Sequence, residues 1–346
     1  MFASKMFLSR PSRLRRLGTV GLLGVMTVIA AFNGIAWMQA RAMTHYVPGA
    51  VIRTRKPELL SNREKAWIVL TGVRVPRPIN TKTPETVGLS YETRTIELPD
   101  GEYLEAWFSP AENAGKSHDS VLAEDIVAQG TVLLFPPYGG SKEALLAPGK
   151  IFHELVYDVL WVDFRGAGGS SGSETTLGVR EGEDVAHAVR YIEQIGTDQP
   201  IILFGGSMGA VAVMRAISHE NVTPDAVIIE SPFDRMLNAV RHRFKASGLP
   251  SFPSAETLLF WGGLQQGIDA FSHNPTDYAQ SMDMPVLLMH GEADTRITNE
   301  DAKAVFDQLP GQKELVIFPT VGHGAFAGDD PEGWKQQVQA FLADAI

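Results

Sequence analysis

The chain has 346 residues and no cysteine, and 44% of its residues are hydrophobic and 20% charged. This length suits one large α/β domain with an accessory segment, and the lack of cysteine excludes disulfide bonds, thiolate catalysis and cysteine-ligated metals. The formal net charge of −10 is unevenly distributed, because residues 1–41 carry six Lys or Arg and no acidic residue and the rest therefore carries −16. Such an acidic body argues against nucleic acid as a partner, since nucleic-acid binding needs cationic surface.

The N-terminal segment has the pattern of a membrane anchor. Residues 17–38 hold no charged side chain, and their length matches the roughly 20 residues with which a helix crosses about 30 Å of hydrocarbon. Arginines precede this stretch, so we expect the basic segment 1–16 in the cytoplasm and the body on the exported side. The alternative is a signal peptide cleaved near Ala40-Arg41-Ala42, which is a poor cleavage site and would give a secreted protein. A buried helix is the least favoured interpretation.

Residues 39–90 are expected to form a linker or lead-in, because prolines interrupt them repeatedly. Within this segment, Ser61 followed three residues later by Glu64 has the pattern of a capping box. We therefore predict a short helix over residues 61–70.

From residue 91 to the end, the pattern predicts one catalytic domain in which strands and helices alternate. A hairpin is expected at 94–98 and 103–109. Further strands are expected at 131–135, 159–162, 201–204, 226–229, 285–290 and 314–318, and helices at 142–154, 179–195, 210–218, 299–308 and 331–345. This alternation predicts an α/β fold with a mostly parallel, doubly wound sheet. Its active site should lie at the carboxyl ends of the strands.

The segment Gly205-Gly206-Ser207-Met208-Gly209 matches the G-x-S-x-G pattern of a nucleophile elbow. In this motif the serine occupies a sharp strand-to-helix turn, where flanking side chains would collide and the helix N-terminus favours developing negative charge. The apolar run 201–204 precedes it and a helical pattern follows, as the motif requires. We predict that Ser207 is a catalytic nucleophile.

A serine hydroxyl needs a base, and the base needs an orienting acid. His323 lies in a glycine-flanked loop after the last expected strand and is the predicted base. Asp294, just beyond the preceding strand, is the predicted acid. Its rivals are Glu292 in the same loop and two acidic residues after an earlier strand, Glu230 and Asp234.

The tetrahedral intermediate needs two N–H donors for its oxyanion. The backbone of Met208, which follows the nucleophile, is the first predicted donor. The loop after strand 131–135 should supply the second. Proline has no N–H, so Pro136 and Pro137 cannot donate, and the backbone of Tyr138 is the predicted donor.

The glycine-rich segment 163–172 lacks both the strand–GxGxxG–helix order and the Walker lysine of phosphate-binding loops. We expect a structural role for it, with hydrogen bonds from Asp163 and Arg165 inside the loop. The sequence contains no H-E-x-x-H motif and its histidines are scattered. We therefore expect neither a metal nor a cofactor.

Taken together, these motifs resemble the α/β-hydrolase superfamily over roughly residues 91–346, because the elbow, the 163–172 loop, the Asp294 loop and the His323 loop follow that family's order. Within it, the chain is similar to the membrane-anchored or exported Bem46-like and serine-aminopeptidase-like hydrolases. The resemblance implies a helical lid at about 231–284. One departure is Pro136-Pro137, where the family usually has His-Gly.

The expected lid is rich in apolar residues, which either pack on the body or line a pocket for acyl or aromatic groups. The resulting expectation is a membrane-tethered serine hydrolase that forms an acyl-enzyme on Ser207. Its substrates would be carboxylic esters, including lysolipids or acylglycerols, and then thioesters. A serine aminopeptidase of the same fold is an alternative that needs lid carboxylates, for which Glu256 and Asp269 are candidates. An alternative of another class is a non-catalytic binding module.

Overall fold

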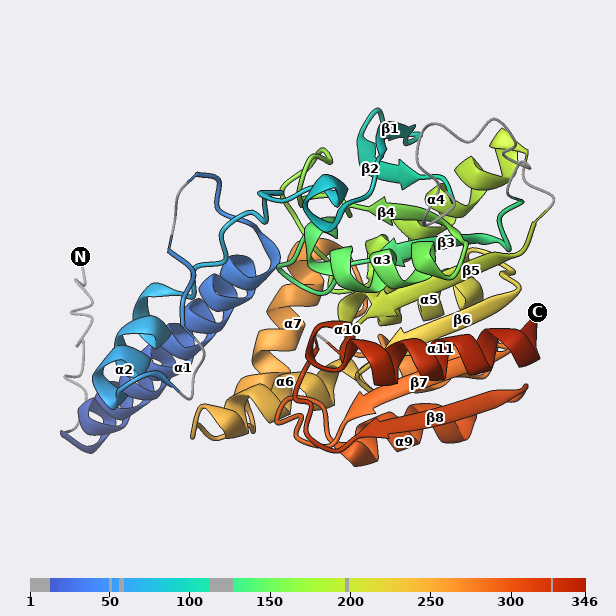
Figure 1. Ribbon diagram of the computed structural model, residues 1–346. Helices are drawn as coiled ribbons and strands as arrows, with labels where there is room; N and C mark the ends of the chain where they lie inside the picture. Colours follow the sequence, from blue (N-terminus) through green and yellow to red (C-terminus); the bar gives the residue numbers. More distant parts are fainter. Residues whose placement is uncertain (1–12, 50–51, 56–58, 112–126, 197–198, 325) are drawn as a thin grey trace, which may run out of the picture.

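The computed structural model describes residues 13–49, 52–55, 59–111, 127–196, 199–324 and 326–346, with side chains from residue 19 onward. Most of the predicted basic segment 1–16 lies outside the described residues. A long helix, α1 (Arg13–Thr44), projects from a layered α/β body (Figure 1). Beside it lies α2 (Asn62–Thr71), and the short 3-10 helix η2 (Pro84–Val87) leads into the sheet.

The body is built on one eight-stranded sheet with the order β1-β2-β4-β3-β5-β6-β7-β8. The hairpin β1–β2 pairs antiparallel with β4, and the other strands are parallel. The strands are β1 (Glu92–Glu97), β2 (Tyr103–Ser109), β3 (Thr131–Phe135), β4 (Asp158–Val162), β5 (Ile201–Gly206), β6 (Ala226–Glu230), β7 (Val286–Gly291) and β8 (Lys313–Phe318). Strands β3, β6 and β7 are buried along their whole length, as expected for parallel strands with helices on both faces.

Two apolar layers cover the sheet. The first includes side chains of α4 (Val179–Ile195), α5 (Met208–His219), α8 (Pro275–Ala279) and α9 (Asn299–Gln308). The second includes α3 (Leu146–Glu154), which follows the 3-10 helix η3 (Lys142–Leu145), together with α10 (Phe326–Asp329) and α11 (Pro331–Ala345). This is the α/β-hydrolase fold that the family resemblance implies, with the mostly parallel sheet that the alternating pattern predicts.

The N-terminal helix is longer than the uncharged stretch 17–38. It continues to Thr44, because no proline or glycine interrupts it between Gly34 and Pro48. From Asn33 onward most of its residues are partly or fully buried, and Gln39 donates a hydrogen bond to the Ile68 carbonyl of α2 (2.6 Å). The predicted capping box of α2 is confirmed, with Ser61 as the N-cap and Glu64 as its partner.

The 55 residues between β6 and β7 hold three helices, α6 (Met236–Ala246), α7 (Ser254–Gln266) and α8. A separate apolar cluster joins this segment to the body, and it includes Val211 of α5, Phe233, Met236, Leu259 and Ile297. The segment therefore packs over the carboxyl end of the sheet, above the residues that form the candidate site.

Candidate active site

The turn between β5 and α5 holds Ser207 in a sparsely populated backbone conformation, with φ 52° and ψ −109°. Non-glycine residues rarely adopt positive φ, and such strain persists only where the surroundings enforce it. Glycine is needed on both sides for steric reasons. A Cβ on Gly205 would lie 2.5 Å from the Ala210 nitrogen, and one on Gly209 would lie 2.1 Å from the Phe135 oxygen. The close approach of α5 to β3 therefore places the serine at the sheet's carboxyl edge.

Ser207, His323 and Asp294 form a continuous hydrogen-bonded chain. The distance from Ser207 Oγ to His323 Nε2 is 3.0 Å, and that from His323 Nδ1 to Asp294 Oδ2 is 2.6 Å. Asp294 follows β7 and His323 follows β8, so two adjacent parallel strands deliver both residues to the edge where β5 ends. The structure therefore brings together the three residues that the sequence singles out.

The Asp294 carboxylate is held in the orientation and charge state that suit this chain. Its other oxygen, Oδ1, accepts the N–H groups of Arg296 (2.7 Å) and Ile297 (3.1 Å). Burial alone raises the pKa of Asp294, but the hydrogen bonds and charge of His323 and these backbone N–H groups outweigh it and lower the pKa below its usual value. An ionised Asp294 accepts a hydrogen bond from the Nδ1–H of His323, and so leaves the Nε2 lone pair directed at Ser207.

The rival acids have other partners. Glu230 is buried under α11, where it accepts the indole N–H of Trp334 at 2.7 Å, and burial raises its pKa to about 8. Asp234 accepts hydrogen bonds from the Arg235 backbone and the Asn238 amide. Glu292 is exposed. Among the described hydrogen bonds, His323 pairs with Asp294 rather than with any of these.

The two predicted oxyanion donors flank the elbow. Met208 is the first residue of α5, so its N–H lies at the helix N-terminus, where no intrahelical acceptor exists. Tyr138 belongs to the loop after β3, whose start lies against Gly209. Among the described residues, neither backbone N–H donates to a protein acceptor. Both therefore remain available to a ligand.

The phenol of Tyr138 connects this loop to the N-terminal helix. Its hydroxyl donates to the Met43 carbonyl at 2.6 Å, in the last turn of α1. Burial raises the pKa of the Tyr138 phenol, which therefore stays protonated as a donor. The end of the apolar helix thus contacts the loop after β3 directly, a link between residues 95 positions apart.

The sequence profile of the prolyl oligopeptidase family matches residues 150–346, which include the whole Ser207–Asp294–His323 chain. The chain belongs to the prolyl oligopeptidase family. The predicted membership of the α/β-hydrolase superfamily is thereby confirmed.

Several relatives of this prolyl oligopeptidase family member carry names of hydrolases. It is 28% identical over 271 residues to the lysophosphatidylserine lipase ABHD12 of Danio rerio, which covers 72% of this chain and 66% of that protein. It is also 28% identical over 195 residues to YqkD of Bacillus subtilis, an uncharacterized protein, with coverage of 56% and 64%. The chain thus spans slightly less than two thirds of the length of these two relatives.

Solved structures show the same fold, and one of them is named as an esterase. The esterase Pf2001 of Pyrococcus furiosus matches 79% of this chain and 99% of its own, with a TM-score of 0.61 and 23% identity. Est1E of Butyrivibrio proteoclasticus, solved with ferulic acid, matches 72% and 99%, with a TM-score of 0.55 and 20% identity. At this level of identity these matches establish the fold of the family member and nothing about its substrate.

The structure also brings two arginines, which no sequence motif indicates, to the loop after β3 of this family member. Arg53 donates to the Gly139 carbonyl at 3.0 Å, and the Arg243 guanidinium lies 5.7 Å from the centre of the Tyr138 ring. Arg243 is exposed and lies near the positive charges of Arg296 and Arg53. In the described part of the chain, neither Arg53 nor Arg243 forms an ion pair with a carboxylate. No sequence signal joins them, because one comes from the lead-in and the other from α6.

The glycine-rich loop 163–172 is linked by hydrogen bonds and ion pairs to elements next to the candidate site. Asp163 accepts the Gly169 N–H inside the loop (3.0 Å), as expected, and it also binds the fully buried ammonium of Lys142 (2.5 Å). Arg165 differs from the expectation, since its strongest contact lies outside the loop, with Asp184 of α4 at 2.7 Å. The Lys142–Asp163 ion pair joins the start of η3 to the end of β4. It thereby fixes the end of the loop that runs from β3 to η3.

Proposed function

We propose that this protein is a membrane-tethered serine esterase in which Ser207 is the nucleophile, His323 the general base and Asp294 the orienting acid. The observation that carries the proposal is the hydrogen-bonded chain from Asp294 Oδ2 through both nitrogens of His323 to Ser207 Oγ. This order of groups activates a hydroxyl that is otherwise a weak nucleophile.

The proposed reaction has two half-reactions. His323 Nε2 takes the Ser207 proton as Oγ attacks the ester carbonyl, and the N–H groups of Met208 and Tyr138 bind the resulting oxyanion. His323 then gives its proton to the leaving alcohol, which departs and leaves an acyl-serine. Water, deprotonated by His323, attacks the acyl carbonyl and releases the carboxylic acid, and the proton returns to Ser207.

The proposed substrates are carboxylic esters with a lipid acyl chain, including lysolipids and acylglycerols, with thioesters next. The name of the lysophosphatidylserine lipase relative supports this class. Arg53 and Arg243 support an anionic group in the substrate, because guanidinium groups that have no carboxylate partner bind phosphate and carboxylate well. An anionic lysophospholipid combines the ester, the acyl chain and the negative charge.

The proposed membrane tether is α1. Within it, Thr19–Thr44 is long and apolar enough to cross a membrane, and most of its apolar window is exposed. Arginines 13, 15 and 16 precede the apolar stretch, so we place the N-terminus in the cytoplasm and the hydrolase body on the exported side. A signal peptide cleaved at the end of α1 is the alternative.

A serine peptidase is the second candidate, favoured by the name of the matching family. An aminopeptidase would need a free carboxylate for the substrate's ammonium group. Glu256 is instead ion-paired with Arg241, and Asp269 accepts the Phe271 N–H at 3.0 Å. The charges identified beside the oxyanion loop are positive, which favours the esterase.

The first test is fluorophosphonate labelling of membranes that contain the wild type, Ser207→Ala or His323→Ala. Labelling of the wild type alone is expected, since the probe needs an activated serine. Hydrolysis of an acyl-ester series and of aminoacyl anilides then separates esterase from peptidase. A folded wild type that neither reacts nor hydrolyses would overturn the proposal and favour a binding module.

A further inference from the structure

Five large apolar side chains lie exposed on the elements beside α1. They are Trp67 and Leu70 of α2, Phe252 before α7, and Phe260 and Leu264 of α7, and we call them the apolar collar. Each is at least 52% exposed. Isolated apolar residues on a surface are normal, but a group of this kind marks an interaction surface.

The collar is held beside α1 by specific contacts. In α7, the Trp261 indole donates to Asn33 Oδ1 at 3.1 Å, and the Gln265 amide donates to the Trp37 carbonyl at 2.9 Å. Both contacts advance by four residues, so α7 runs alongside α1 in the same direction. Gln39 makes the corresponding bond to the Ile68 carbonyl of α2. Figure 1 shows α2 and α7 next to α1 at the same end of the molecule.

The length of α1 places this region at a membrane boundary. The uncharged stretch 17–38 is about 33 Å long at 1.5 Å per residue, close to the roughly 30 Å of hydrocarbon in a bilayer. The body already packs on α1 from Asn33. The last six uncharged residues, about 9 Å of helix, therefore lie beside α7, and α2 contacts the next residue, Gln39. If the stretch spans the hydrocarbon, those two helices must enter the adjoining interfacial layer.

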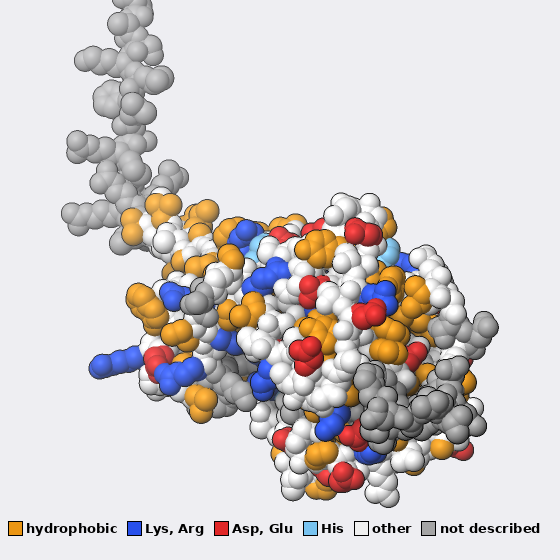
Figure 2. Space-filling model, turned by 45° about the horizontal axis from the view of Figure 1, so that its top comes forward, with side chains coloured by type: hydrophobic (Ala, Val, Ile, Leu, Met, Phe, Trp, Pro, Cys, Tyr) orange, Lys and Arg blue, Asp and Glu red, His pale blue; other side chains and the backbone are white. Residues whose placement is uncertain are grey.

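The side chains around the collar suit that layer. Aromatic rings are enriched at membrane interfaces, and basic residues beside them interact with lipid phosphates. Basic residues occur on α2 of the collar and on the neighbouring α6, with Arg63 exposed on α2 and Lys245 exposed on α6. Lys65 of α2 donates to the Ser247 carbonyl at 3.1 Å. Figure 2 shows hydrophobic, Lys and Arg side chains interspersed toward the left of the molecule, on the side of α1 and α2.

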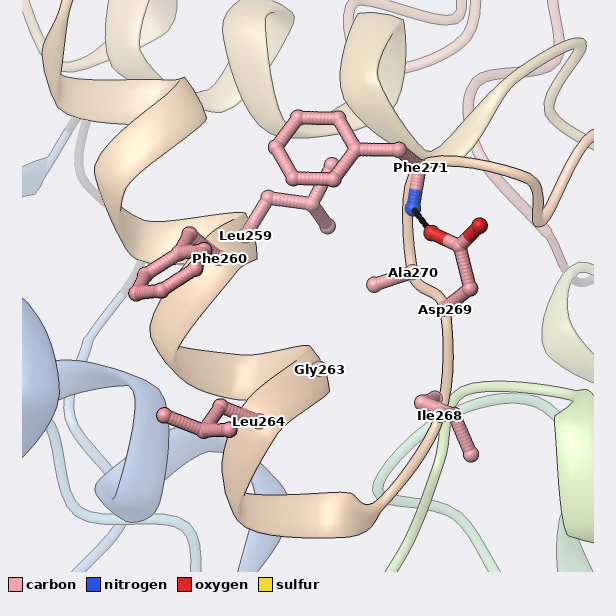
Figure 3. Close-up of a pocket in the computed structure, with 8 residues that line it drawn as sticks. All are labelled: Leu259, Phe260, Gly263, Leu264, Ile268, Asp269, Ala270 and Phe271. Atoms are coloured by element: carbon pink, nitrogen blue, oxygen red, sulfur yellow. Dashed lines mark hydrogen bonds between the residues drawn. The ribbon is translucent and has the colours of Figure 1, made fainter.

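An apolar hollow of about 200 Å³ lies within this surface, between α7 and residues 268–271. Figure 3 shows Leu259 and Phe271 close together at one end of it, while Phe260 and Leu264 project from α7 away from the 268–271 loop. The lining is apolar except for Asp269, whose carboxylate accepts the Phe271 N–H. The hollow therefore suits hydrocarbon rather than a polar ligand.

We propose that the apolar collar sits in the interfacial layer of the bilayer that α1 spans, on the side of the hydrolase body. This rests on the proposed membrane insertion of α1. The collar then fixes the height of the site above the lipid. From Asn33 to Met43, which contacts Tyr138, the helix rises about 15 Å. An acyl chain can thus remain partly in the bilayer while its ester reaches Ser207.

The test uses the full-length protein in phosphatidylcholine vesicles, with single cysteines that carry a polarity-sensitive fluorophore. The chain has no cysteine of its own, so each label is unique. Phe260→Cys reports the collar. Val25→Cys, exposed on α1, reports the anchor, and Ile195→Cys, equally apolar and exposed on α4, is the matched control. Vesicles brominated near the headgroup or deep in the acyl chain quench labels according to depth.

We expect the label at 260 to be quenched by shallow bromine, the label at 25 by deep bromine, and the label at 195 by neither. Quenching of the label at 25 without quenching of the label at 260 would overturn the proposed position of the collar and would leave the proposed membrane anchor intact. If neither the label at 25 nor the label at 260 were quenched, the proposed insertion of α1 in the membrane would be overturned. This result would not depend on whether the fluorophosphonate labels Ser207. A label at 260 that is shielded from water but unquenched would assign the surface to a second protein copy and also overturn the proposal.

A functional readout follows from the same geometry. The double variant Trp67→Ser and Phe260→Ser should hydrolyse a short water-soluble ester at the wild-type rate, because neither residue belongs to the proposed catalytic chain. On esters embedded in vesicles its rate should fall several-fold, through a raised apparent KM. Equal rates on the vesicle substrate would contradict a role for the collar in substrate access.

Discussion

Asp294 acts in the proposed mechanism through its charge, which several donors stabilise. The Asp294→Asn variant keeps the shape of the side chain but removes the charge, so His323 loses the partner that orients its Nδ1–H. We expect kcat to fall by about 10³–10⁴-fold, with circular dichroism unchanged. Because the pKa of Asp294 is lowered, its charge persists into moderately acidic solution. A variant that retained most of its activity would mean that another residue orients His323.

Arg243 is expected to distinguish anionic from neutral substrates. Arg243→Ala should lower kcat/KM for a lysophospholipid by about tenfold or more, because hydrogen bonds to charged groups contribute about 1.5–3 kcal/mol. Its kcat/KM for a monoacylglycerol should stay near the wild-type value. The control is Arg241→Ala on the same helix, since Arg241 is already paired with Glu256. Equal losses of kcat/KM on both substrates would show that Arg243 does not recognise the negative charge of the lysophospholipid.

At the scale of the elements, the elbow depends on how closely α5 approaches β3. Gly209→Ala places a Cβ 2.1 Å from the Phe135 carbonyl oxygen, so the helix must move away from the strand. We expect a loss of about 1–3 kcal/mol in the free energy of unfolding, and a larger loss of kcat, since Met208 moves with the helix. In the matched control, Gly328→Ala, the added Cβ meets nothing within 4 Å. Urea unfolding of both variants checks the difference.

Glu230 joins β6 to α11 and gives the fold a pH dependence. Its pKa is about 8 in the folded protein, against an ordinary value of 4.5. Between these values the folded state holds a proton that the unfolded chain has lost, so stability decreases as pH rises from about 4.5 to about 8. Glu230→Gln keeps an acceptor for Trp334 and removes this titration.

The melting temperature of Glu230→Gln should therefore exceed that of the wild type by several degrees at pH 8, and the two should converge near pH 4.5. Thermal scans of both proteins at several pH values provide the measurement. A constant difference across this range would mean that Glu230 does not titrate there.

At the scale of the whole molecule, the absence of cysteine makes the orientation measurable. Lys303→Cys places a thiol on an exposed part of α9, at the cost of the surface pair with Asp307, which contributes about 0.5 kcal/mol or less. In intact cells, an impermeant maleimide should label this thiol and should not label Ser9→Cys in the basic segment. The reverse pattern would place the body in the cytoplasm. Release of the labelled body from membranes would indicate a cleaved signal.

Much of the fold follows from local pattern. The predicted bounds of the helices at 179–195, 299–308 and 331–345 are those of the structure, because a helical period sustained over ten or more residues is a strong local signal. The strand at 201–204 continues to Gly206 in the structure, since nothing in the apolar pattern marks the last paired residues. Similarly, residues 142–145 form a 3-10 turn before α3, a distinction that side-chain periodicity cannot make.

By itself the sequence determined the nucleophile motif, the alternation of strands and helices, and the uncharged N-terminal stretch, because each depends on residues close together in the chain. It also singled out His323 and Asp294, which the structure brings within hydrogen-bonding distance of one another; their catalytic roles remain predictions. Only the tertiary structure decided that Arg53 contacts Gly139 while Arg243 lies over the neighbouring Tyr138 ring. The same is true of the packing of α1 on α2 and α7. Such contacts depend on the path of the chain in space, and no local spacing or period encodes that path.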